Sequence, residues 1–560
     1  MQITGAEAII KSLIHLGVTD IFGYPGGTIM PTYDAMFHEK DLRHILVRHE
    51  QGAVIAAGGY ARATNRVGVC VATSGPGATN LVTGIADAML DSVPIVCITG
   101  QVNSSLIGTD AFQEADIIGM TIPITKWNYQ ICNANEIPYI ISKAFHIARY
   151  GRPGPVLIDI TKDAQFNKLE FNLADINIHQ YHYPKISEAQ ISQAAHLINQ
   201  AKRPYILAGH GIAISEAEQE LLEFANKTGI PVACTLHGLS TINTNHPLYA
   251  GMLGMHGNYG SNLLTNEADL IIAIGMRFDD RVTGNLATYA KNAKIIHIDI
   301  DKAELGKNVF AHVAIEGDAK EVLGELVHIV SPNNHSEWIK QFADLHNLEK
   351  EQIVDHAITP KPNSQIKMAE VIHMLSQKTD DGNSIIVSDV GQHQMIAARY
   401  YSFNKAKTHI TSGGLGTMGF ALPSAIGVKT ARPTQNVIAV VGDGGFQMNI
   451  QELAVLVQDD IAVKILILNN GYLGMVRQWQ ELFFDKRYSF TELLNPDFVK
   501  IAEAYSIPGV RVSKHEDLSS AIDQMLNSPT AFLLEVDVEK EENVFPMVPA
   551  GCGVGEIRLS

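Results

Sequence analysis

Two short stretches decide the fold: Val-Ile-Ala-Val-Val-Gly-Asp-Gly-Gly-Phe at residues 437–446, and the pair Asn469-Asn470 about 27 residues after Asp443. Residues 437–441 are typical of a buried strand, residues 447–458 have helical spacing, and residues 462–468 indicate a second apolar strand. Such a crossover is almost always right-handed, which makes the two strands parallel. Asp443 and Asn470 are therefore expected at one carboxyl edge of a sheet, where open α/β sheets bind ligands.

Asp443 and Asn470 offer two oxygen ligands beside a glycine turn. Mg²⁺ prefers such ligands and keeps its other positions for waters and phosphate oxygens. Backbone N–H groups of the turn and of the helix start are suited to hold the phosphates. The spacing resembles the signature of thiamine diphosphate (ThDP) enzymes. The alternative is two structural polar residues at strand ends.

Length and composition narrow the class of protein. The chain has 560 residues, with 46% hydrophobic and 18% charged residues, as expected for a globular protein of three or four domains. A net charge of -17 argues against non-specific nucleic-acid binding. The sequence has neither an 18-residue apolar run nor the features of a signal peptide, and its five cysteines form no CxxC pair. We expect a cytosolic protein without membrane spans or disulfides.

Alternating strands and helices predict an α/β protein with three doubly wound parallel-sheet domains. The expected bounds are 1–165, 188–335 and 366–545, followed by a tail at 546–560. Polar segments at 165–187 and 346–365 are the predicted linkers, and Thr4 with Glu7 predicts a capping box at the first helix. The first unit repeats the strand-turn-helix-strand order of the third around residues 67–98. Either a duplication or the shared pattern of α/β domains explains that repeat.

A second glycine motif, Gly414-Leu415-Gly416-Thr417-Met418-Gly419, has the GxGxxG spacing of dinucleotide-binding folds. That interpretation needs an acidic residue about 20 positions further on. None stands near Thr434, and the next acid is Asp443. We therefore do not interpret the motif as a nicotinamide site.

Glu50 follows the apolar run Ile45-Leu46-Val47 and opens a helix of small residues. An acid in a first helical turn is often only a partner of the helix dipole, worth about 0.3–1 kcal/mol. ThDP chemistry, however, needs one acid beside the aminopyrimidine ring to favour its imino tautomer, while the cofactor supplies the electron sink. Glu50 is the candidate for that acid.

Motifs along nearly the whole chain resemble the catalytic subunits of acetohydroxyacid synthase (biosynthetic acetolactate synthase). These motifs are Tyr24-Pro25-Gly26-Gly27, His49-Glu50-Gln51-Gly52-Ala53, Ser74-Gly75-Pro76-Gly77-Ala78-Thr79-Asn80, Gly151-Arg152-Pro153-Gly154-Pro155, Gly254-Met255-His256-Gly257, Arg277-Phe278-Asp279-Asp280-Arg281-Val282-Thr283-Gly284 and Gly474-Met475-Val476-Arg477-Gln478-Trp479, together with the GDG and Asn-Asn pair. The resemblance implies a ThDP-dependent decarboxylase-like architecture and the cofactors ThDP, Mg²⁺ and FAD.

The resemblance also implies an activity. Pyruvate would be decarboxylated on ThDP, and the hydroxyethyl carbanion would attack a second 2-oxo acid. The product would be 2-acetolactate from pyruvate or 2-aceto-2-hydroxybutyrate from 2-oxobutyrate, for valine, leucine and isoleucine biosynthesis. A homodimer or tetramer is implied, with Glu50 and Asp443 of each active site coming from different subunits, and so is a separate small regulatory subunit.

The family pattern assigns roles at the ThDP site. Glu50 would activate the cofactor, the carbonyl of Gly416 would face its 4′-amino group, and Met418 would hold its rings bent. Met418 alone would suggest only core packing. The magnesium ligands would be Asp443, Asn470 and the backbone carbonyl of Tyr472. Further ThDP contacts are implied for Val390, Gly391, Gln392, His393, Gly442, Gly444 and Gly445.

Five residues are implied at the acceptor pocket: Phe112, Gln113, Arg281, Met475 and Trp479. The planar fork of Arg281 suits a carboxylate; the alternative is a loop ion pair with an adjacent aspartate. Trp479 and Met475 would favour 2-oxobutyrate over pyruvate, because one methylene in an apolar pocket contributes about 1–3 kcal/mol.

The central unit resembles a flavin-binding domain. Glycine turns and basic side chains suit a pyrophosphate, and acids at strand ends suit ribose. The implied FAD contacts are Arg152, Gly209, His210, Gly211, Thr235, Leu236, Met252, Gly254, Met255, His256, Arg277, Arg281, Asp299 and Asp318. The alternative is a domain of this type that has lost its ligand.

Other functions remain open at this stage. A flavin-free catabolic acetolactate synthase would need no FAD, and a flavin-dependent pyruvate oxidase would consume oxygen. The acid at position 50 disfavours a glyoxylate carboligase. A protein of another class, which binds the cofactors without turnover, would lack activity altogether.

Overall fold

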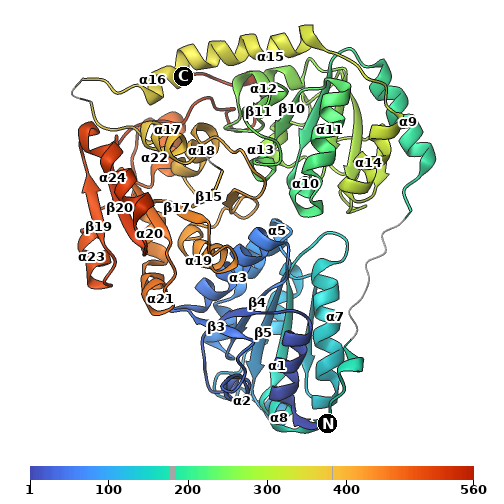
Figure 1. The fold of residues 1–560 in the computed structure, drawn as a ribbon, viewed down its shortest axis with the longest axis vertical. Coiled ribbons are helices and arrows are strands. Elements are labelled where there is room, and N and C mark those ends of the chain that lie inside the picture. Colours follow the sequence, from blue (N-terminus) through green and yellow to red (C-terminus); the bar gives the residue numbers. More distant parts are fainter. Residues whose placement is uncertain (177–184, 363, 381) are drawn as a thin grey trace.

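The computed structural model describes residues 1–176, 185–362, 364–380 and 382–560. Three α/β domains each contain a six-stranded parallel sheet, as expected (Figure 1). Their central strands are apolar on both faces, because helices cover both sides of a parallel sheet. In β17 (Asn436–Gly442) and β18 (Lys464–Asn469), for example, most residues are buried.

The N-terminal domain has the strand order β3-β2-β4-β5-β7-β6. Its strands are β2 (Asp20–Gly23), β3 (Arg43–Leu46), β4 (Gly68–Ala72), β5 (Ile95–Gln101), β6 (Trp127–Ile131) and β7 (Val156–Thr161). Its helices are α1 (Gly5–His15), α2 (Met30–Met36), α3 (Glu50–Thr64), α4 (Pro76–Thr79), α5 (Val82–Leu90), α6 (Ile117–Thr121), α7 (Ile137–Arg149) and α8 (Lys162–Phe166). The capping box of Thr4 and Glu7 is confirmed at the start of α1.

The central domain has the order β11-β10-β9-β12-β13-β14. Its strands are β9 (Pro204–Ala208), β10 (Val232–Cys234), β11 (Tyr249–Met252), β12 (Leu270–Ile274), β13 (Lys294–Asp299) and β14 (Val313–Glu316). Its helices are α9 (Glu188–Gln200), α10 (His210–Ser215), α11 (Glu218–Thr228), α12 (Tyr259–Thr265), α13 (Asp280–Thr283) and α14 (Ala319–Ile329). The short edge strands β11 and β14 were not anticipated from the sequence.

The C-terminal domain has the order β16-β15-β17-β18-β20-β19. Besides β17 and β18, its strands are β15 (Ser384–Ser388), β16 (His409–Thr411), β19 (Gly509–Val512) and β20 (Phe532–Asp537). Its helices are α17 (Met368–Lys378), α18 (Gln392–Tyr400), α19 (Ala421–Ala431), α20 (Asp443–Met448), α21 (Leu453–Gln458), α22 (Gly474–Phe483), α23 (Phe498–Ala504) and α24 (His515–Asn527). The predicted parallel pairing of β17 with β18 is confirmed.

The helix expected at 447–458 differs from the structure. It starts earlier, as α20 at Asp443, and is interrupted before α21. The interruption falls at Asn449, whose backbone leaves the helical region at φ -135°. The Asn449 side chain instead donates to the carbonyl of Gly419 at 2.6 Å. A tertiary hydrogen bond therefore replaces helix continuation there.

The first and third domains share one topology. With strands numbered within each domain, both sheets have the order 2-1-3-4-6-5, whereas the central sheet has 3-2-1-4-5-6. The faint sequence repeat thus corresponds to two domains of the same strand order. In each sheet, successive strands are first added on one side of the first strand and then on its other side. Ligands of open α/β sheets bind at such a switch point, outside the carboxyl ends of the strands.

Both segments expected to be linkers contain ordered structure. After Gln165 the chain forms β8 (Lys168–Glu170), which pairs with β1 (Gln2–Thr4). Residues 177–184 of that segment lie outside the described residues. The segment at 346–365 continues α15 (Ser336–Glu349) through a π-helical turn (Lys350–Val354) into α16 (Asp355–Ile358). The prediction of a linker was wrong because it treated the charged residues as solvent-exposed, whereas Glu349 is buried.

The N- and C-terminal domains meet along α3 and α19, which lie together near the centre of the molecule (Figure 1). Glycines allow the two backbones to touch. A Cβ atom at Gly427 would lie 1.8 Å from the carbonyl oxygen of Ala56, and one at Gly59 would lie 2.2 Å from that of Ser424. The small residues that follow Glu50 therefore serve close packing between domains.

Candidate functional site

A pocket opens at the carboxyl edge of the C-terminal sheet, at its switch point between β15 and β17. Residues from both strand ends and from the loop after β18 line it: Val390, Gly391, Gln392, His393, Met418, Gly442, Asp443, Gly444, Gly445, Asn470, Tyr472 and Met475. The prediction that Asp443 and Asn470 leave the sheet at one edge is therefore confirmed. Nearly all residues implied at the ThDP diphosphate and metal site line this one pocket.

Asp443 lies at the start of α20 and is buried. Burial raises the pKa of its carboxyl to about 6, against hydrogen bonds from Asn495 and backbone amides. One oxygen accepts from Nδ2 of Asn495 at 2.6 Å. A divalent cation would offset the cost of keeping this carboxylate ionised, so the residue fits a magnesium ligand. Asn495 was missed by the sequence reasoning, which offered no motif at that position.

Asn470 sits opposite in the same pocket. Its Oδ1 accepts from the amide of Tyr472 at 3.1 Å, which shapes the turn after β18. Gly471, between them, has φ +68°. That turn brings the Tyr472 backbone to the pocket wall, which is compatible with the proposed carbonyl ligand. Within the described residues no three His, Cys, Asp or Glu side chains cluster as a metal site; the candidate site instead combines one carboxylate with amide and backbone oxygens.

His393, in the first turn of α18, is fully enclosed. Burial lowers its pKa to about 3, so the ring is neutral near pH 7. Its Nε2 has no hydrogen-bond partner in the described part of the chain. Cβ atoms at Gly391 or Gly442 would both lie 2.8 Å from the ring. A buried ring nitrogen without a partner beside glycine turns fits a site for phosphate oxygens.

The turn before α19 carries Gly416 and Met418. Met418 reaches the pocket wall, since its Cε would lie 3.8 Å from a Cβ at Gly444. Gly416 is at the rim with φ +72° and is exposed. In the GxGxxG motif, amides of Gly413 and Gly414 donate to Asp91 and that of Gly419 donates to Asp389. These amides are occupied, which agrees with rejecting the dinucleotide interpretation.

Glu50 belongs to the opposite domain. It is the first residue of α3, after the cap residue His49, and is partly exposed. Oε2 accepts from Nδ2 of Asn80 at 2.9 Å, and Oε1 would lie 3.2 Å from a Cβ at Gly77. The helix start and the Ser74–Asn80 turn thus hold the carboxylate in place. Glu50 does not line the Asp443 pocket, whose described lining comes from residues 368–476.

The residues expected at the acceptor pocket are not gathered in one cavity of a single chain. Met475 and Trp479 lie one turn apart on α22, and Trp479 is 39% exposed. Arg281 lies in a separate cavity beside the C-terminal tail, with its Nε 3.7 Å from Asp280. Phe112, on the N-terminal domain, is 88% exposed. Gln113 packs against Gly75.

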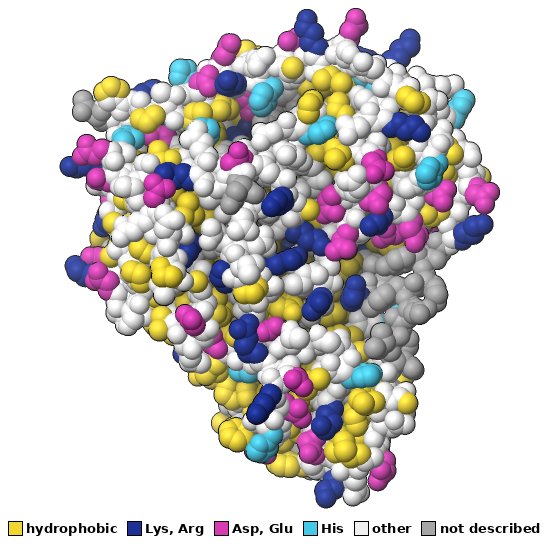
Figure 2. All heavy atoms as spheres, viewed as in Figure 1, with side chains coloured by type: hydrophobic (Ala, Val, Ile, Leu, Met, Phe, Trp, Pro, Cys, Tyr) yellow, Lys and Arg dark blue, Asp and Glu magenta, His cyan; other side chains and the backbone are white. Residues whose placement is uncertain are grey.

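A cavity of about 560 Å³ lies where all three domains meet. A volume of that size suits a bound cofactor. Figure 2 shows Lys and Arg side chains in a band across the middle of this face, where the N-terminal domain meets the other two. The cavity residues include basic side chains from two domains: Arg62, Arg66, Arg149, Arg152 and Arg277. Carboxylates line the cavity as well: Asp91, Glu216, Asp279, Asp299, Glu304 and Asp318. The arginines can contact the diphosphate of a dinucleotide and the strand-end acids its ribose hydroxyls, so individual side chains rather than a net positive charge suit such a ligand.

The cavity holds many, but not all, of the residues implied for FAD. Those that line it are Arg152, His210, Gly211, Thr235, Arg277, Asp299 and Asp318. Gly209 lies directly behind them, because a Cβ there would lie 2.2 Å from the carbonyl of Gly275. Leu236, Met252, Gly254, His256, Met255 and Arg281 are not in the described lining, and the last two share the second cavity. The single chain thus divides the predicted flavin contacts between two places.

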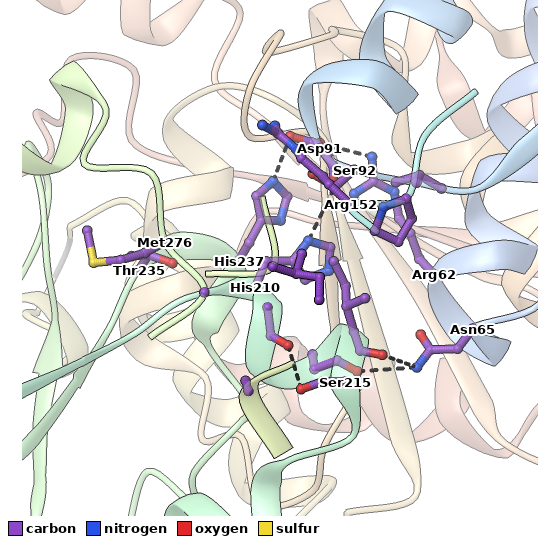
Figure 3. A pocket seen from close by; sticks show the side chains of 18 of the residues that line it. Arg62, Asn65, Asp91, Ser92, Arg152, His210, Ser215, Thr235, His237 and Met276 are labelled. Atoms are coloured by element: carbon purple, nitrogen blue, oxygen red, sulfur yellow. Dashed lines mark hydrogen bonds and ion pairs between the residues drawn. The ribbon is translucent and has the colours of Figure 1, made fainter. Parts of the chain in front are cut away.

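Charged and polar partners inside the cavity are well defined (Figure 3). Arg152 donates to Ser92 Oγ at 2.8 Å and to Glu304 at 2.9 Å. Asp299, at the end of β13, is buried, and burial raises its pKa to about 6. In Figure 3, His210 and His237 point towards Asp91; His237 Nε2 lies 3.0 Å from its Oδ1.

Sequence reasoning missed several cavity residues. Asp91, Ser92 and His237 reach it from two domains. His237 had a signal, since it directly follows the predicted pair Thr235-Leu236. Asp91 had none, because an aspartate at a helix end is usually solvated and only the packing of three domains buries it.

A buried ion pair links the helix at the Asp443 pocket to the loop at residues 256–257 of the central domain. Arg399 of α18 pairs with Glu349, and both side chains are at most 3% exposed. Arg399 also donates to the carbonyls of His256 and Gly257 at 2.6 and 2.8 Å. Glu349 accepts from the amide of Tyr259 at 2.7 Å. The pair thus joins the helix that starts at the Asp443 pocket to the loop predicted to contact FAD.

Two general expectations can be compared with the structure. No helix among the described residues is both long and apolar enough to cross a membrane. All five cysteines are free, and Cys70, Cys97 and Cys234 are buried. Cys70 and Cys97 are register partners on the neighbouring strands β4 and β5, and both are free thiols.

Three family models match the chain. They are the N-terminal TPP binding domain, the central domain and the C-terminal TPP binding domain of thiamine pyrophosphate enzymes, at residues 3–120, 191–326 and 389–536. The acetolactate synthase isozyme 2 large subunit of Escherichia coli K12 is 45% identical over 556 residues, covering 99% of each chain. The acetolactate synthase large subunit of Lactococcus lactis is 47% identical over 99% of this chain and 96% of its own. That of Corynebacterium glutamicum is 46% identical over 100% and 90%.

Proposed function

The chain belongs to the family of acetolactate synthase large subunits, and we propose that it catalyses the reaction for which these relatives are named. It decarboxylates pyruvate and joins the remaining two-carbon unit to a second 2-oxo acid, pyruvate or 2-oxobutyrate. The products are 2-acetolactate and 2-aceto-2-hydroxybutyrate, precursors of branched-chain amino acids. The observation that carries this proposal is full-length similarity combined with one pocket that holds Asp443, Asn470 and Met418.

ThDP, when bound, supplies a carbon nucleophile and an electron sink. Glu50 holds a proton at the aminopyrimidine ring, and Asn80 orients its carboxylate. Gly416 presents its carbonyl and Met418 its side chain from the turn before α19. The glycines at 391, 442, 444 and 445 keep space for the diphosphate, and His393 supplies a ring nitrogen towards it.

Mg²⁺ is the proposed metal. Asp443 and Asn470 supply side-chain oxygens and Tyr472 a backbone carbonyl. Support comes from the chemistry of these donors in one pocket and from the buried carboxylate of Asp443. The ion would offset the negative charge of the diphosphate that is proposed to bind at the glycine turns.

FAD is the proposed ligand of the large cavity. Arg152 and Arg277 suit the pyrophosphate, and Asp299 and Asp318 suit polar groups of ribose or adenine. Glycines 209 and 211 permit the close approach of strand ends β9 and β12 that shapes the cavity. Nothing in these residues supplies a redox role for the flavin.

The acceptor substrate is proposed to meet Arg281, Met475, Trp479, Phe112 and Gln113. Arg281 would bind its carboxylate with a two-pronged contact. These side chains lie in different domains, so the proposal requires a second subunit to complete the pocket. A homodimer with sites at its interface satisfies this requirement, and so does a tetramer built from such dimers. Phe112 and Trp479 are exposed in the single chain and therefore accessible to a second subunit. A separate small regulatory subunit is proposed because the relatives are named large subunits.

The test is pyruvate turnover by the purified chain with ThDP and Mg²⁺, with and without FAD. Acetolactate and oxygen are measured in the same reaction. We expect acetolactate that depends on all three cofactors, without oxygen uptake. Acetolactate formed equally well without FAD would instead indicate a flavin-free catabolic enzyme, and oxygen uptake would indicate an oxidase.

A further inference from the structure

A buried polar cluster joins the N-terminal domain to the turn between β16 and α19. We call it the Asp87/Asp91 cluster: Arg62 of α3, Asp87 and Asp91 at the end of α5, and Ser412 and Thr417 of the turn. The two aspartates are 3% exposed, Ser412 1% and Thr417 7%. Neither family resemblance nor any sequence motif assigned a role to these residues.

The two carboxylates hold the turn at four positions. Asp87 accepts from the hydroxyls of Ser412 and Thr417, the latter at 2.9 Å. Asp91 accepts from the amides of Gly413 at 3.1 Å and Gly414 at 2.7 Å. These amides and hydroxyls belong to a segment without regular secondary structure, so side chains from another domain satisfy its backbone.

Arg62 completes the cluster. Its Nη2 lies 2.9 Å from both carboxylates, and its guanidinium stacks over the ring of Phe420 with 5.3 Å to the centroid. Burial disfavours charge on Asp91, but His237, Arg62 and the Gly413 amide together hold the pKa of Asp91 well below its usual range. Arg62 stands in the helix that begins at Glu50. One cluster therefore contacts the helix of the acid and the turn of Gly416 and Met418.

Burying charge is a costly way to stabilise a fold, since well-packed apolar side chains of similar volume often do as well or better. Apolar side chains, however, cannot accept hydrogen bonds from a turn. On its far side the same turn is held by Asp389, which accepts from the amides of Gly419 and Ala421, each at 2.9 Å. Carboxylates thus fix both ends, while Gly416 and Met418 between them stay free to face a ligand.

We propose that Asp87 and Asp91 are positioning residues for the reaction: from the N-terminal domain they fix the backbone that presents the Gly416 carbonyl and Met418 to ThDP. This inference rests on the proposed function, because it assigns the two aspartates to the ThDP site of that function. A shift of the turn by about 1 Å would misplace the carbonyl relative to the aminopyrimidine ring, and such misplacements cost up to about a hundredfold in rate.

The test compares the rate of hydrogen–deuterium exchange at C2 of bound ThDP, at saturating ThDP and Mg²⁺, in wild type and variants. Thr417→Val keeps the shape of the side chain but removes the hydroxyl, whereas Thr417→Ser keeps the hydroxyl. We expect Asp87→Asn and Thr417→Val to slow exchange about tenfold or more and Thr417→Ser to restore most of it. If Asp87→Asn does not fold, the Val and Ser pair decides alone.

Asp159→Asn is the matched control. Asp159 is a buried carboxylate of the same domain that accepts from Thr99 and Gln101, away from the turn. It should lower the thermal midpoint while leaving exchange within about twofold of wild type. Exchange at the wild-type rate in both Asp87→Asn and Thr417→Val would overturn the positioning role. Absence of acetolactate or of ThDP exchange in wild type would instead reject the proposed function itself.

Discussion

Glu50 and Asp443 show how differently two acids of one proposed site are held. Asp443 is enclosed by its own domain, and burial raises its pKa to about 6. Glu50 is partly exposed at a helix start and is oriented by a single amide, that of Asn80. Asp443 is therefore suited to bind a metal ion, whose charge offsets the cost of burying the carboxylate. Glu50 is suited to contact an aminopyrimidine ring that approaches from outside the N-terminal domain.

Glu50→Gln removes the group proposed to hold a proton at the aminopyrimidine ring. We expect turnover of pyruvate to fall by about 10²–10⁴, the usual range for losing an acid–base group. Asn80→Ala leaves the acid in place but frees it, and should cost about tenfold. Acetolactate assays at saturating ThDP measure both. Glu136→Gln, a carboxylate of the same domain that accepts from Tyr129, should behave as wild type, and full activity in Glu50→Gln would reject the role.

Glu452 gives a prediction about pH. Its carboxyl accepts from the amide of Arg48 at 3.2 Å and is buried. Burial raises its pKa to about 7 from an ordinary 4.5, outweighing these hydrogen bonds. The folded state therefore takes up a proton between these two values, and the stability contributed by the protonated carboxyl is lost as pH rises from about 4.5 through about 7.

Glu452→Gln cannot titrate, so the difference in stability between wild type and variant isolates this residue. Between about pH 5 and about pH 8, we expect the free energy of unfolding of wild type to fall by up to about 3 kcal/mol relative to that of Glu452→Gln. Thermal midpoints of both proteins, measured across this range, test it. Parallel curves would mean that the carboxyl is ionised in the folded state throughout.

Trp479 tests the proposed acceptor pocket. Trp479→Leu removes much of the apolar surface that would contact the extra methylene of 2-oxobutyrate. In competition between 2-oxobutyrate and pyruvate, we expect the product ratio to shift towards acetolactate by about tenfold. Phe37→Leu, which shortens another exposed aromatic side chain of the chain, is the control and should leave the ratio unchanged. An unchanged ratio in Trp479→Leu would place the selectivity elsewhere.

At the scale of elements, helix starts and turns are held by residues from other parts of the chain. The Glu349 carboxylate accepts from the start of α12, Glu452 from the residues before α3, and Asp91 from the turn before α19. Side chains thus satisfy backbone groups that these segments cannot satisfy themselves. The positions of the candidate site are consequently set by contacts between elements far apart in sequence.

The pair of Arg399 and Glu349 is the strongest example and gives a prediction. Arg399→Gln leaves the buried Glu349 without its cation, which should cost about 3–5 kcal/mol. The double variant Arg399→Gln, Glu349→Gln carries no unpaired charge and should be more stable than the single one. Thermal midpoints and the amount of flavin retained after gel filtration measure the effect. Lys500→Gln, which breaks an exposed ion pair, should show no measurable change, and a single variant as stable as wild type would contradict the argument.

At the scale of the whole molecule, the two halves of the proposed site do not share a pocket within one chain. The Asp443 pocket is lined by the C-terminal domain, and Glu50, on the N-terminal domain, is not among the residues that line it. In a twofold dimer, a contact between the N-terminal domain of one chain and the C-terminal domain of the other is made twice, because the symmetry repeats it. A dimer would then bring Glu50 of one chain to Asp443 of the other.

Mixing two inactive variants tests this arrangement. Glu50→Gln and Asp443→Ala chains, unfolded together and refolded in equal amounts, form mixed dimers in half of the cases, each with one intact site. About a quarter of wild-type activity should return. Separate refolding of each variant is the control. If each site were built within one chain, the mixture would stay inactive.

Local sequence patterns were enough to predict the class of fold and the family of enzymes. Apolar runs and glycine turns around Asp443 predicted the parallel strands correctly, because burial on both faces of a sheet leaves a local pattern. Motif spacing also predicted that Asp443 and Asn470 leave the sheet at one edge, whereas Met418 in the same pocket was implied only by the family resemblance. Such features depend on neighbours along the chain or on one βαβ unit.

Several buried charges could be found only from the packing of distant segments. Asp87, Asp91 and Glu349 look like solvated charges in the sequence, and the segment containing Glu349 was expected to be a linker. They are buried because three domains pack around them, and each then accepts hydrogen bonds from a distant segment. The sequence offers no local pattern for such residues, since the cost of burying a charge is offset by partners as far as 330 positions away.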